Sequence, residues 1–245
     1  MLSAVIITRD EADRIGVALA SVAFADEVLI LDCGSTDATV AVARAAGARV
    51  VETDWPGHVA QKNRGLAMAS GEWVLSIDAD EEVSPALRAS ILEAVARAGD
   101  AVGFRVNRRN EWLGHTLRHG GWYPDARVRL VRRGRATWAG ENPHDTLVPD
   151  GPVLPLDGDL LHRPYRSFGE HLATLDRYTT IAAAEARARG RGGSVLDLLI
   201  RPPWAFFRGY VLRAGFLDGA PGLVVAALGA LYVLVKWARI RAVLS

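Results

Sequence analysis

The chain contains a single cysteine, Cys33, among its 245 residues. One cysteine cannot form an internal disulfide, so the cysteine content gives no sign of an oxidising compartment. The N-terminus also lacks a basic segment followed by an apolar core, because the apolar residues 4–7 begin almost at once and are followed by Thr8, Arg9 and Asp10. We therefore expect a cytoplasmic protein whose first apolar run is a strand and not a signal peptide.

Glycine-rich phosphate loops are missing as well. Neither G-x-G-x-x-G nor G-x-x-x-x-G-K-[ST] occurs in the sequence, which disfavours a dinucleotide oxidoreductase and a P-loop nucleotidase. There is no internal repeat and no low-complexity linker. With 50% hydrophobic residues, the chain is long enough to bury the core of one domain that carries an appendage.

The net charge of +1 is unevenly distributed along the chain. Residues 186–245 hold nine Lys and Arg against two acidic residues, a charge of +7, which leaves −6 on residues 1–185. The basic end is also apolar, with aromatic residues interleaved between Arg201, Arg208 and Arg213. This combination is typical of binding to a membrane surface more than to nucleic acid. We predict a globular domain at 1–185 and a helical, membrane-associating tail at 186–245, with a hinge at 190–193.

Residues 220–235 form a continuous apolar run within this tail. The run is shorter than the roughly 20 residues that a helix needs to cross a bilayer, and Pro221, Gly222 and Gly229 loosen it. We therefore expect a monotopic or re-entrant anchor. A buried helix of an oligomer and a short membrane span are the alternatives.

Strand and helix patterns alternate through the first half of the chain. Predicted strands lie at 4–7, 27–31, 48–52 and 73–77, and predicted helices lie at 10–22, 38–46 and from Gln61 onward. Such alternation indicates an α/β fold with a mostly parallel sheet flanked by helices. Ligands of such sheets bind beyond the carboxyl ends of the strands.

The strand predicted at 73–77 leads directly into an acidic cluster. Asp78 and Asp80 would share one face if the chain stayed extended, although a turn could re-aim them. Two carboxylates that converge without a Lys or Arg between them repel each other, and a divalent cation relieves that repulsion. The plainer interpretation is a solvated acidic turn before a helix that starts at Ser84-Pro85.

A second polar turn, residues 32–37, follows the strand predicted at 27–31. Asp32 at the strand end could contact a base or ribose, while the following helix start offers N–H groups to a phosphate. Simple N-capping by Ser35, Thr36 and Asp37 is the alternative. The polar helix start at 61–64 could likewise reach a nucleotide or remain solvated.

Four ordered blocks in the first half resemble family 2 glycosyltransferases of the GT-A fold. They are IITRDE (6–11), LDCGSTD (31–37), QKN (61–63) and GEWVLSIDADE (71–81). Blocks in the second half resemble the bacterial subgroup that includes lipopolysaccharide inner-core β-1,4-glucosyltransferases: HGGWYPD (119–125), RLVRR (129–133), PHD (143–145), RY (177–178) and GFLDG (215–219). The resemblance implies a cytoplasmic, inverting enzyme that uses a nucleotide-diphosphate sugar and a divalent cation.

The resemblance also implies roles for individual residues. Asp78 and Asp80 would hold the metal and the diphosphate. The nucleotide sugar would be contacted by Thr8, Asp10, Glu11, Asp32, Lys62, Asn63 and Asp78. The chain departs from the family at Cys33, where many relatives have a second Asp, and at His144-Asp145, where the subgroup usually has His-Glu.

Inversion by direct displacement needs a base that takes the proton of the acceptor hydroxyl. We predict Asp145 as this base, with Asp125 as the runner-up, and His144 either as a further metal ligand or as a residue that orients Asp145. Trp122 and Tyr123 offer aromatic faces to a sugar or could pack under a loop. The basic side chains of Arg127, Arg129, Arg132 and Arg133 are predicted on the outer face of one strand, where they are solvated or bind an acidic acceptor or the diphosphate. Arg129 is the one predicted to contact the acceptor.

The sequence therefore predicts a metal-dependent hexosyltransferase. The expected donor is UDP-glucose, the cofactor is Mg²⁺ or Mn²⁺, and the acceptor is a lipid-linked envelope saccharide such as the lipopolysaccharide inner core, at the cytoplasmic face of the inner membrane. Transfer to polyprenyl phosphate or another envelope glycan, a non-catalytic nucleotide-sugar-binding scaffold and a nucleotidyltransferase are the alternatives. Sequence alone separates donors and acceptors poorly, because one hydroxyl in a pocket can decide between them.

Overall fold

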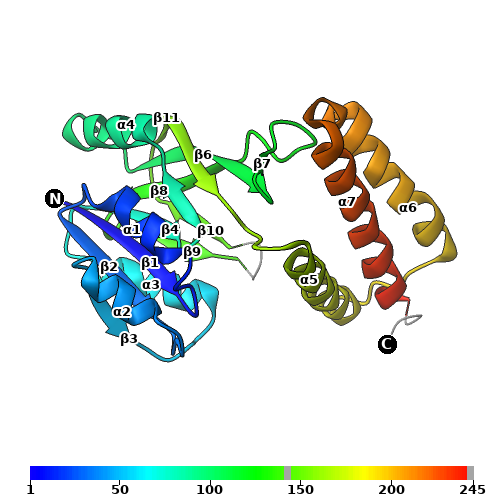
Figure 1. Cartoon of the computed structure of the whole chain (residues 1–245), viewed down its shortest axis with the longest axis horizontal. Helices are drawn as coiled ribbons and strands as arrows, with labels where there is room; N and C mark the ends of the chain where they lie inside the picture. Colours follow the sequence, from blue (N-terminus) through cyan, green and yellow to red (C-terminus); the bar gives the residue numbers. More distant parts are fainter. Residues whose placement is uncertain (141–144, 242–245) are drawn as a thin grey trace. The chain divides into compact units, whose positions relative to one another are not determined.

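The computed structural model describes residues 1–140 and 145–241 (Figure 1). The chain forms two compact units. The first comprises residues 1–108 and 126–162, and the second comprises residues 109–125 together with the chain from 163 onward. The predicted boundary at residue 185 falls inside helix α5 (Phe168–Ala188), which the second unit contains whole because α5 packs against the last helix.

The first unit is built on a sheet with the strand order β3-β2-β1-β4-β8-β6-β11-β5. The strands are β1 (Leu2–Thr8), β2 (Glu27–Asp32), β3 (Arg49–Glu52), β4 (Trp73–Asp78), β5 (Glu81–Val83), β6 (Gly103–Trp112), β8 (Ala126–Arg132) and β11 (Val153–His162). β1 pairs in parallel with β2 and β4, and β2 with β3, whereas β8 is antiparallel to β4 and β6. The predicted α/β fold is confirmed, and its parallel half comes from the first half of the chain.

Helices flank this sheet, and their bounds lie close to the predicted ones. They are α1 (Ile15–Val22), α2 (Thr39–Ala45), α3 (His58–Met68) and α4 (Pro85–Ala96). Ser84 caps α4 by accepting a hydrogen bond from the Leu87 N–H, and Pro85 occupies the first helical position, as the Ser-Pro pair predicted.

Helix α1 begins later than the predicted residue 10. Asp10 has a φ of 54°, a left-handed conformation that an α-helix cannot contain. The N–H of Glu11 donates instead to the Thr39 hydroxyl at 2.8 Å. This segment thus satisfies its backbone donors through the neighbouring loop, and the helix starts only at Ile15.

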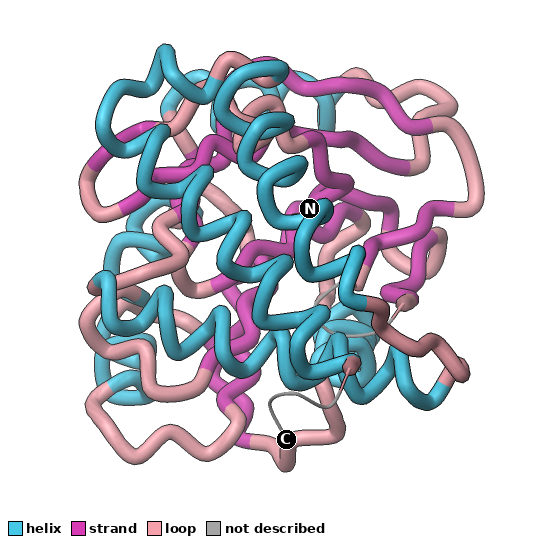
Figure 2. Tube along the Cα trace, turned by 90° about the vertical axis from the view of Figure 1, so that its right-hand side faces the viewer, coloured by secondary structure: helices cyan, strands magenta, loops and turns pink. Residues whose placement is uncertain are grey.

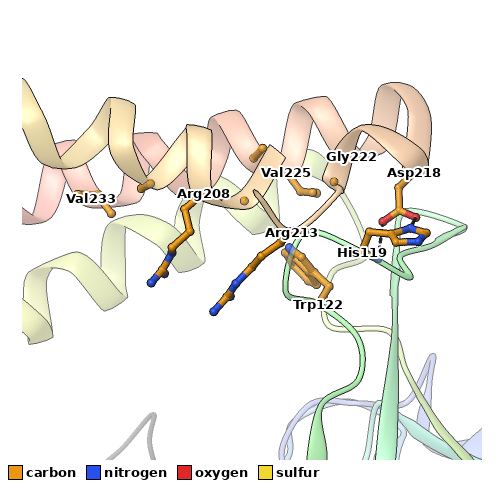
Figure 3. A pocket seen from close by; sticks show the side chains of 14 residues that line it. His119, Trp122, Arg208, Arg213, Asp218, Gly222, Val225 and Val233 are labelled. Atoms are coloured by element: carbon orange, nitrogen blue, oxygen red, sulfur yellow. Dashed lines mark hydrogen bonds and ion pairs between the residues drawn. The ribbon is translucent and has the colours of Figure 1, made fainter. Parts of the chain in front are cut away.

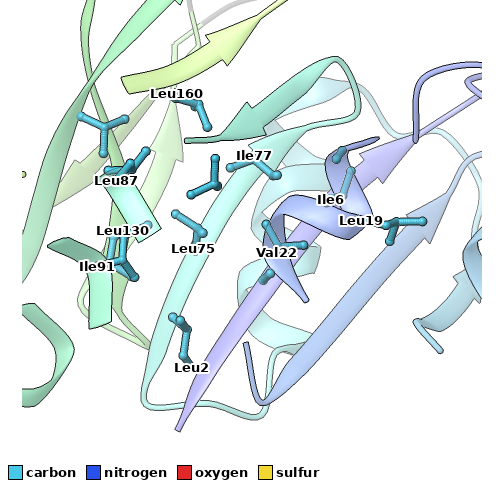
Figure 4. Packing of buried hydrophobic residues seen from close by; sticks show 14 of the residues in the cluster. Leu2, Ile6, Leu19, Val22, Leu75, Ile77, Leu87, Ile91, Leu130 and Leu160 are labelled. Atoms are coloured by element: carbon cyan, nitrogen blue, oxygen red, sulfur yellow. The ribbon is translucent and has the colours of Figure 1, made fainter. Parts of the chain in front are cut away.

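The hydrophobic core lies on both faces of the sheet. Successive residues of β1 point to opposite faces, so Ile6 packs with side chains from α1 and α4 (Figure 4), while Val5 packs on the other face with Leu66 of α3. That second face is also covered by a two-stranded ribbon of β9 (Ala136–Ala139) and β10 (Thr146–Pro149). Trp138 and Leu147 anchor the ribbon there. Each such buried side chain contributes about 1.5–3 kcal/mol to stability.

The second unit is mostly helical (Figure 2, which faces these helices). Besides α5 it contains β7 (His115–Thr116), α6 (Val195–Phe207), the π-helix η1 (Arg208–Leu212), the 3₁₀-helix η2 (Gly215–Asp218) and α7 (Gly219–Ile240). Both α5 and α6 pack against α7. Ser194 and Asp197 form a capping box that starts α6 just after the glycine-rich segment where the hinge was predicted.

The last helix is longer than the apolar run that the sequence displays. It continues past residue 235 to Ile240, and Gly215–Ile240 is long and apolar enough to cross a bilayer by length and composition. Only 22% of its most apolar window is buried in the structure, which is low for the core helix of a soluble protein. The length of this helical segment therefore does not argue against a membrane crossing.

Candidate active site

The carboxyl ends of β1, β2 and β4 bring three predicted site residues to one edge of the sheet. Thr8 is in register with Asp32, and Ile7 is in register with Asp78. All three strands are parallel, so their last residues face the same crevice. The Thr8 hydroxyl is buried and has no hydrogen-bond partner among the residues that the structure describes.

Asp32 organises the turn after β2. Its carboxylate accepts hydrogen bonds from the N–H groups of Gly34 and Ser35, both at 2.9 Å, and from the Ser35 hydroxyl at 2.5 Å. Gly34 has a φ of 80°, which a glycine adopts without strain. Asp32 is 1% exposed, so its carboxylate is committed to shaping this turn.

The loop after β1 is bonded to the loop after β2. The Asp10 carboxylate accepts a hydrogen bond from the Thr36 N–H at 2.7 Å, and the Asp10 N–H donates to the Ser35 hydroxyl at 2.9 Å. Glu11 forms an ion pair with Arg14 at 2.8 Å. Asp10 and Glu11 therefore fix the shape of the two loops that border the crevice.

Asp78 lies between two cationic side chains. Its carboxylate is 3.2 Å from the Lys62 ammonium and 3.0 Å from the Arg129 guanidinium. Burial alone would raise the pKa of Asp78, but the charges of Lys62 and Arg129 outweigh it and hold that pKa far below its usual range. Asp78 is thus an anion that two cations neutralise, so in the structure Lys62 and Arg129 relieve the repulsion for which the sequence suggested a divalent cation.

Lys62 connects Asp78 to the predicted base, Asp145. Its ammonium is 2.8 Å from an Asp145 carboxylate oxygen and lies 4.4 Å from the centre of the Trp138 ring. The side chains of Lys62 and Asp145 are 8% and 11% exposed. These residues line a cavity of about 250 Å³, with Arg108, Arg127 and Arg129 on the same wall. Asp78 and Asp145, which are 67 positions apart in sequence, therefore share one cation and one cavity.

Arg129 was predicted on the outer face of its strand, and that prediction is wrong. Arg129 is 4% exposed, and its guanidinium contacts Glu81 at 2.6 Å in addition to Asp78. Burial acts to lower the pKa of Arg129, but the carboxylates of Glu81 and Asp78 more than offset it and raise that pKa above its usual value. Arg108 lies 3.6 Å from the same Glu81. The strand of Arg129, β8, lies between β4 and β6, so basic side chains in a strand pattern do not by themselves mark a solvated face.

Asp80 faces a different partner from Asp78. β4 ends at Asp78, a turn follows, and Asp80 lies 3.4 Å from the His162 ring at the end of β11. A turn therefore follows β4, which was one of the two sequence alternatives, and Asp80 has a different ion-pair partner from Asp78. In residues 1–140 and 145–241, no group of three or more His, Cys, Asp or Glu side chains gathers around one point. His144 lies outside the described residues.

The chain is similar in sequence to known glycosyltransferases. Residues 3–146 match the family model described as "Glycosyl transferase family 2". The lipopolysaccharide core biosynthesis glycosyltransferase LpsC of Rhizobium meliloti is 32% identical over 98% of this chain and 91% of its own length. The chain belongs to glycosyl transferase family 2. It is therefore a glycosyltransferase.

Other matches support the same assignment. An uncharacterized glycosyltransferase of Rickettsia bellii is 29% identical over 98% of this chain and 86% of its own length. Among solved structures, the mannosyltransferase PcManGT of Pyrobaculum calidifontis, in complex with GDP-Man and Mn²⁺, aligns with a TM-score of 0.57 over 100% of this chain and 88% of that one, at 17% identity. This likeness confirms the GT-A fold.

Some predicted contact residues of this glycosyltransferase have structural partners of their own. The side-chain amide of Asn63 accepts from the Trp138 N–H at 2.8 Å and donates to the Trp138 carbonyl at 2.9 Å, which ties α3 to β9. Cys33, where many relatives have Asp, is buried and accepts a hydrogen bond from the Gln61 amide at 3.1 Å. Burial raises the pKa of the Cys33 thiol, so the residue stays neutral.

Three further candidates belong to the second compact unit. They are Trp122, Tyr123 and the alternative base Asp125. The Trp122 carbonyl accepts a hydrogen bond from the Asn110 side chain at 2.8 Å, and the Trp122 ring packs with an apolar cluster that includes Trp112. Packing was the plainer interpretation of these aromatic residues, and it accounts for the contacts of Trp122.

Residues that sequence reasoning missed complete the site. Glu81 was visible in the acidic cluster, but its burial beside Arg129 depends on its place at the start of β5, which pairs with β11. Trp138 and His162 carry no local motif. Trp138 reaches the site through the hydrogen bonds of β9 to Asn63 in α3, and His162 through the pairing of β11 with β5. Arg108 is one residue of an Arg-rich strand and becomes distinctive only through its neighbour Glu81.

Proposed function

We propose that this glycosyltransferase transfers glucose, with inversion, from UDP-glucose to a lipid-linked saccharide of the bacterial envelope such as the lipopolysaccharide core. The proposal rests on one observation above all: Lys62 pairs with both Asp78, at a strand end, and Asp145, and all three line one cavity. The similarity to LpsC, which is named for lipopolysaccharide core biosynthesis, supports the acceptor class.

In this proposal the residues of the cavity divide the work of a displacement reaction. Asp145 takes the proton of the acceptor hydroxyl as that oxygen attacks the anomeric carbon. Lys62 and Arg129, which balance Asp78 in the structure, are cations that can also face the diphosphate of the donor. The buried and unpaired hydroxyl of Thr8 offers a hydrogen bond to the nucleotide at the neighbouring strand end.

A divalent cation would have Asp78 and Asp80 as its protein ligands at this edge of the sheet, and oxygens of the donor diphosphate would have to complete its coordination, since the described residues form no cluster of three metal ligands. Asp78 and Asp80 supply carboxylate oxygens, and the imidazole of His162 lies beside Asp80. Oxygen ligands suit Mg²⁺ and Mn²⁺, and a single imidazole is compatible with Mn²⁺. When bound there, such a cation stabilises the charge of the leaving diphosphate.

We further propose that the enzyme works at the cytoplasmic face of the inner membrane. α6 and the segment after it expose large apolar side chains, including Leu199, Ile200 and Trp204. Exposed arginines alternate with them, which suits the headgroup region of an anionic leaflet. An acceptor embedded in the same leaflet would then meet the enzyme in two dimensions.

Turnover with purified, detergent-solubilised protein tests this function. The assay follows glucose transfer from radiolabelled UDP-glucose to a lipopolysaccharide core extract, with and without Mn²⁺. We expect Asp145→Asn and Asp80→Asn to lower kcat/KM by at least about 100-fold, a common cost of losing a catalytic acid–base or metal group. The matched control is Asp150→Asn, a surface carboxylate whose ion-pair partner is Arg135, and it should leave turnover unchanged.

Other outcomes would redirect the proposal. Transfer that is as fast in Asp145→Asn as in the unmodified enzyme would remove Asp145 as the base. Binding of UDP-glucose without transfer to any acceptor, unaffected by both substitutions, would favour a nucleotide-sugar-binding scaffold. Transfer to polyprenyl phosphate but not to core extract would retain the reaction and change the acceptor.

A further inference from the structure

The second unit contains a cavity of its own, of about 180 Å³. It lies within this unit and is lined by the loop at 119–122, the end of α6, both η-helices and α7 (Figure 3). We propose that this cavity binds a phosphate monoester carried by a membrane lipid. The proposal rests on the membrane association in the proposed function and gives the ligand a specific site.

The wall on the loop side is held in place by Asp218. Its carboxylate accepts hydrogen bonds from the Arg118 N–H at 3.1 Å and the His119 N–H at 2.9 Å, and it lies 2.7 Å from Nδ1 of the His119 ring (Figure 3). The Asp218 carboxylate therefore has its hydrogen-bond partners within the loop at 118–119. This leaves the cavity without an uncompensated acidic group among its lining residues.

The floor of the cavity is close-packed backbone. A Cβ atom on Gly222 would lie 1.9 Å from the Gly215 carbonyl oxygen, and one on Gly215 would lie 2.8 Å from the Gly209 carbonyl oxygen. Both distances are too short for a side chain, so these positions require glycine. The start of α7 thus sits directly on η2, and the cavity has a defined shape.

Two cations border this cavity without anionic partners. Within the described chain, the side chains of Arg208 and Arg213 have neither a hydrogen bond nor an ion pair, and both are exposed. Figure 3 shows the two side chains extending toward the same side of the α6–α7 pair. Two guanidinium groups of like charge on one side favour an anion that can accept several hydrogen bonds from them. A phosphate monoester, with close to two negative charges at neutral pH, matches this pair in charge.

The surroundings indicate that the phosphate is attached to a lipid. Val225, Ala226 and Val233 of α7 line the same cavity and form an apolar wall beside the arginines. The segments next to Arg208 and Arg213 expose Phe207 and Leu212, which are 43% and 58% exposed. Apolar side chains beside a cationic pair suit the boundary between headgroups and acyl chains. A soluble phosphate would use the arginines but not the apolar wall.

Co-sedimentation of the full-length protein with vesicles tests the proposal. Phosphatidylcholine vesicles containing phosphatidic acid, a phosphate monoester, are compared with vesicles that contain enough phosphatidylglycerol to give the same measured surface charge. We expect tighter binding to the phosphatidic acid vesicles. The Arg208→Gln/Arg213→Gln variant should reduce the ratio of the two affinities by about tenfold or more, because it removes at least one charge-assisted hydrogen bond. The control Arg189→Gln/Arg191→Gln removes the same charge from the same unit and should keep the preference.

A second variant tests the cavity without changing its charge. A Cβ at Gly229 would meet no atom within 4 Å, so Gly229→Ala is compatible with the fold and adds a methyl group to the lining of the cavity. We expect it to weaken binding to phosphatidic acid while the thermal midpoint stays at or above that of the unmodified protein, because a helical glycine is replaced. Unchanged binding in this variant would overturn the assignment to this cavity.

Further arms separate the sources of the phosphate. Vesicles with phosphorylated lipid A are compared with vesicles in which the glycolipid is dephosphorylated, and glycerol phosphate is added as a soluble competitor. Lipid selectivity that depends on the arginines supports the proposal for either lipid. Three results would overturn it: equal binding to the phosphatidic acid and phosphatidylglycerol vesicles, equal losses in the arginine pair and its control, or competition by glycerol phosphate at concentrations that match the lipid. All arms omit UDP-glucose, so failure here leaves the transfer reaction untouched, and failure of transfer leaves this binding untouched.

Discussion

Lys62 offers a direct test of the site because one side chain neutralises two carboxylates. Lys62→Met removes the charge while keeping most of the side-chain volume, and it leaves Asp145 without its ion pair at 2.8 Å. Loss of one partner of a buried pair costs about 3–5 kcal/mol. Asp78 keeps Arg129 at 3.0 Å, so we expect the lower end, about 3 kcal/mol of unfolding free energy at pH 7.

The dependence on pH gives the same test a second readout. The pKa of Asp78 is lowered in the folded protein, so its ion pairs stabilise the fold above the unfolded pKa of about 3.9 and this stability is lost as the pH falls below it. Without Lys62 that pKa rises toward its usual value. The loss of stability between about pH 5 and pH 3 should therefore be smaller in Lys62→Met than in the unmodified protein.

Urea denaturation followed by fluorescence, at several pH values, measures both effects. The matched control is Arg135→Met, which breaks a pair with Asp150 at the same distance of 2.8 Å but with both side chains at least half exposed. Exposed pairs contribute about 0–1 kcal/mol, so this variant should change little. A Lys62→Met protein as stable as the Arg135→Met protein, with the unmodified pH dependence, would refute the bridging role of Lys62.

Three further predictions concern other parts of the chain. Glu81→Gln should lower the unfolding free energy by about 3 kcal/mol in urea denaturation, because it removes a buried carboxylate that holds Arg129 at 2.6 Å. Gly158→Ala should lower the thermal midpoint by several degrees, since its φ is 88° and the added Cβ would lie 2.3 Å from the Leu87 nitrogen; an unchanged midpoint would contradict this packing. Burial lowers the pKa of His171, so the folded protein favours the neutral ring. The stability that this ring contributes is full above the unfolded pKa of about 6.5 and declines as the pH falls below it. His171→Gln retains an acceptor for the Trp112 N–H, so it should reduce the change of the thermal midpoint between about pH 7.5 and pH 5.

The sequence was most informative where local pattern and global topology agree. Alternating strands and helices predicted the parallel sheet, and parallel strands necessarily bring Thr8, Asp32 and Asp78 to one edge. The Ser84-Pro85 pair marked the start of α4 because capping depends on neighbouring residues only. These features follow from short-range chemistry, which a single sequence records.

Other features depend on pairings between distant segments. The cations around Asp78 come from α3 and β8, and the partner of Asp80 comes from the end of β11. Nothing in the spacing of Asp78 and Asp80 indicates that the turn between them separates their partners. Burial of Arg129 likewise follows from its strand lying between β4 and β6, which the arginine-rich pattern alone did not reveal.

The interleaving of the two units in sequence has a practical consequence for protein engineering. Residues 109–125 belong to the second unit although they lie between two segments of the first. The chain therefore passes from one unit to the other after residues 108, 125 and 162. A truncation near residue 162 would therefore leave the loop that carries His119 and Trp122 without the helices of its own unit. A chimera that exchanges the second unit between relatives should carry residues 109–125 and the C-terminal helices as one set, with junctions at these three points.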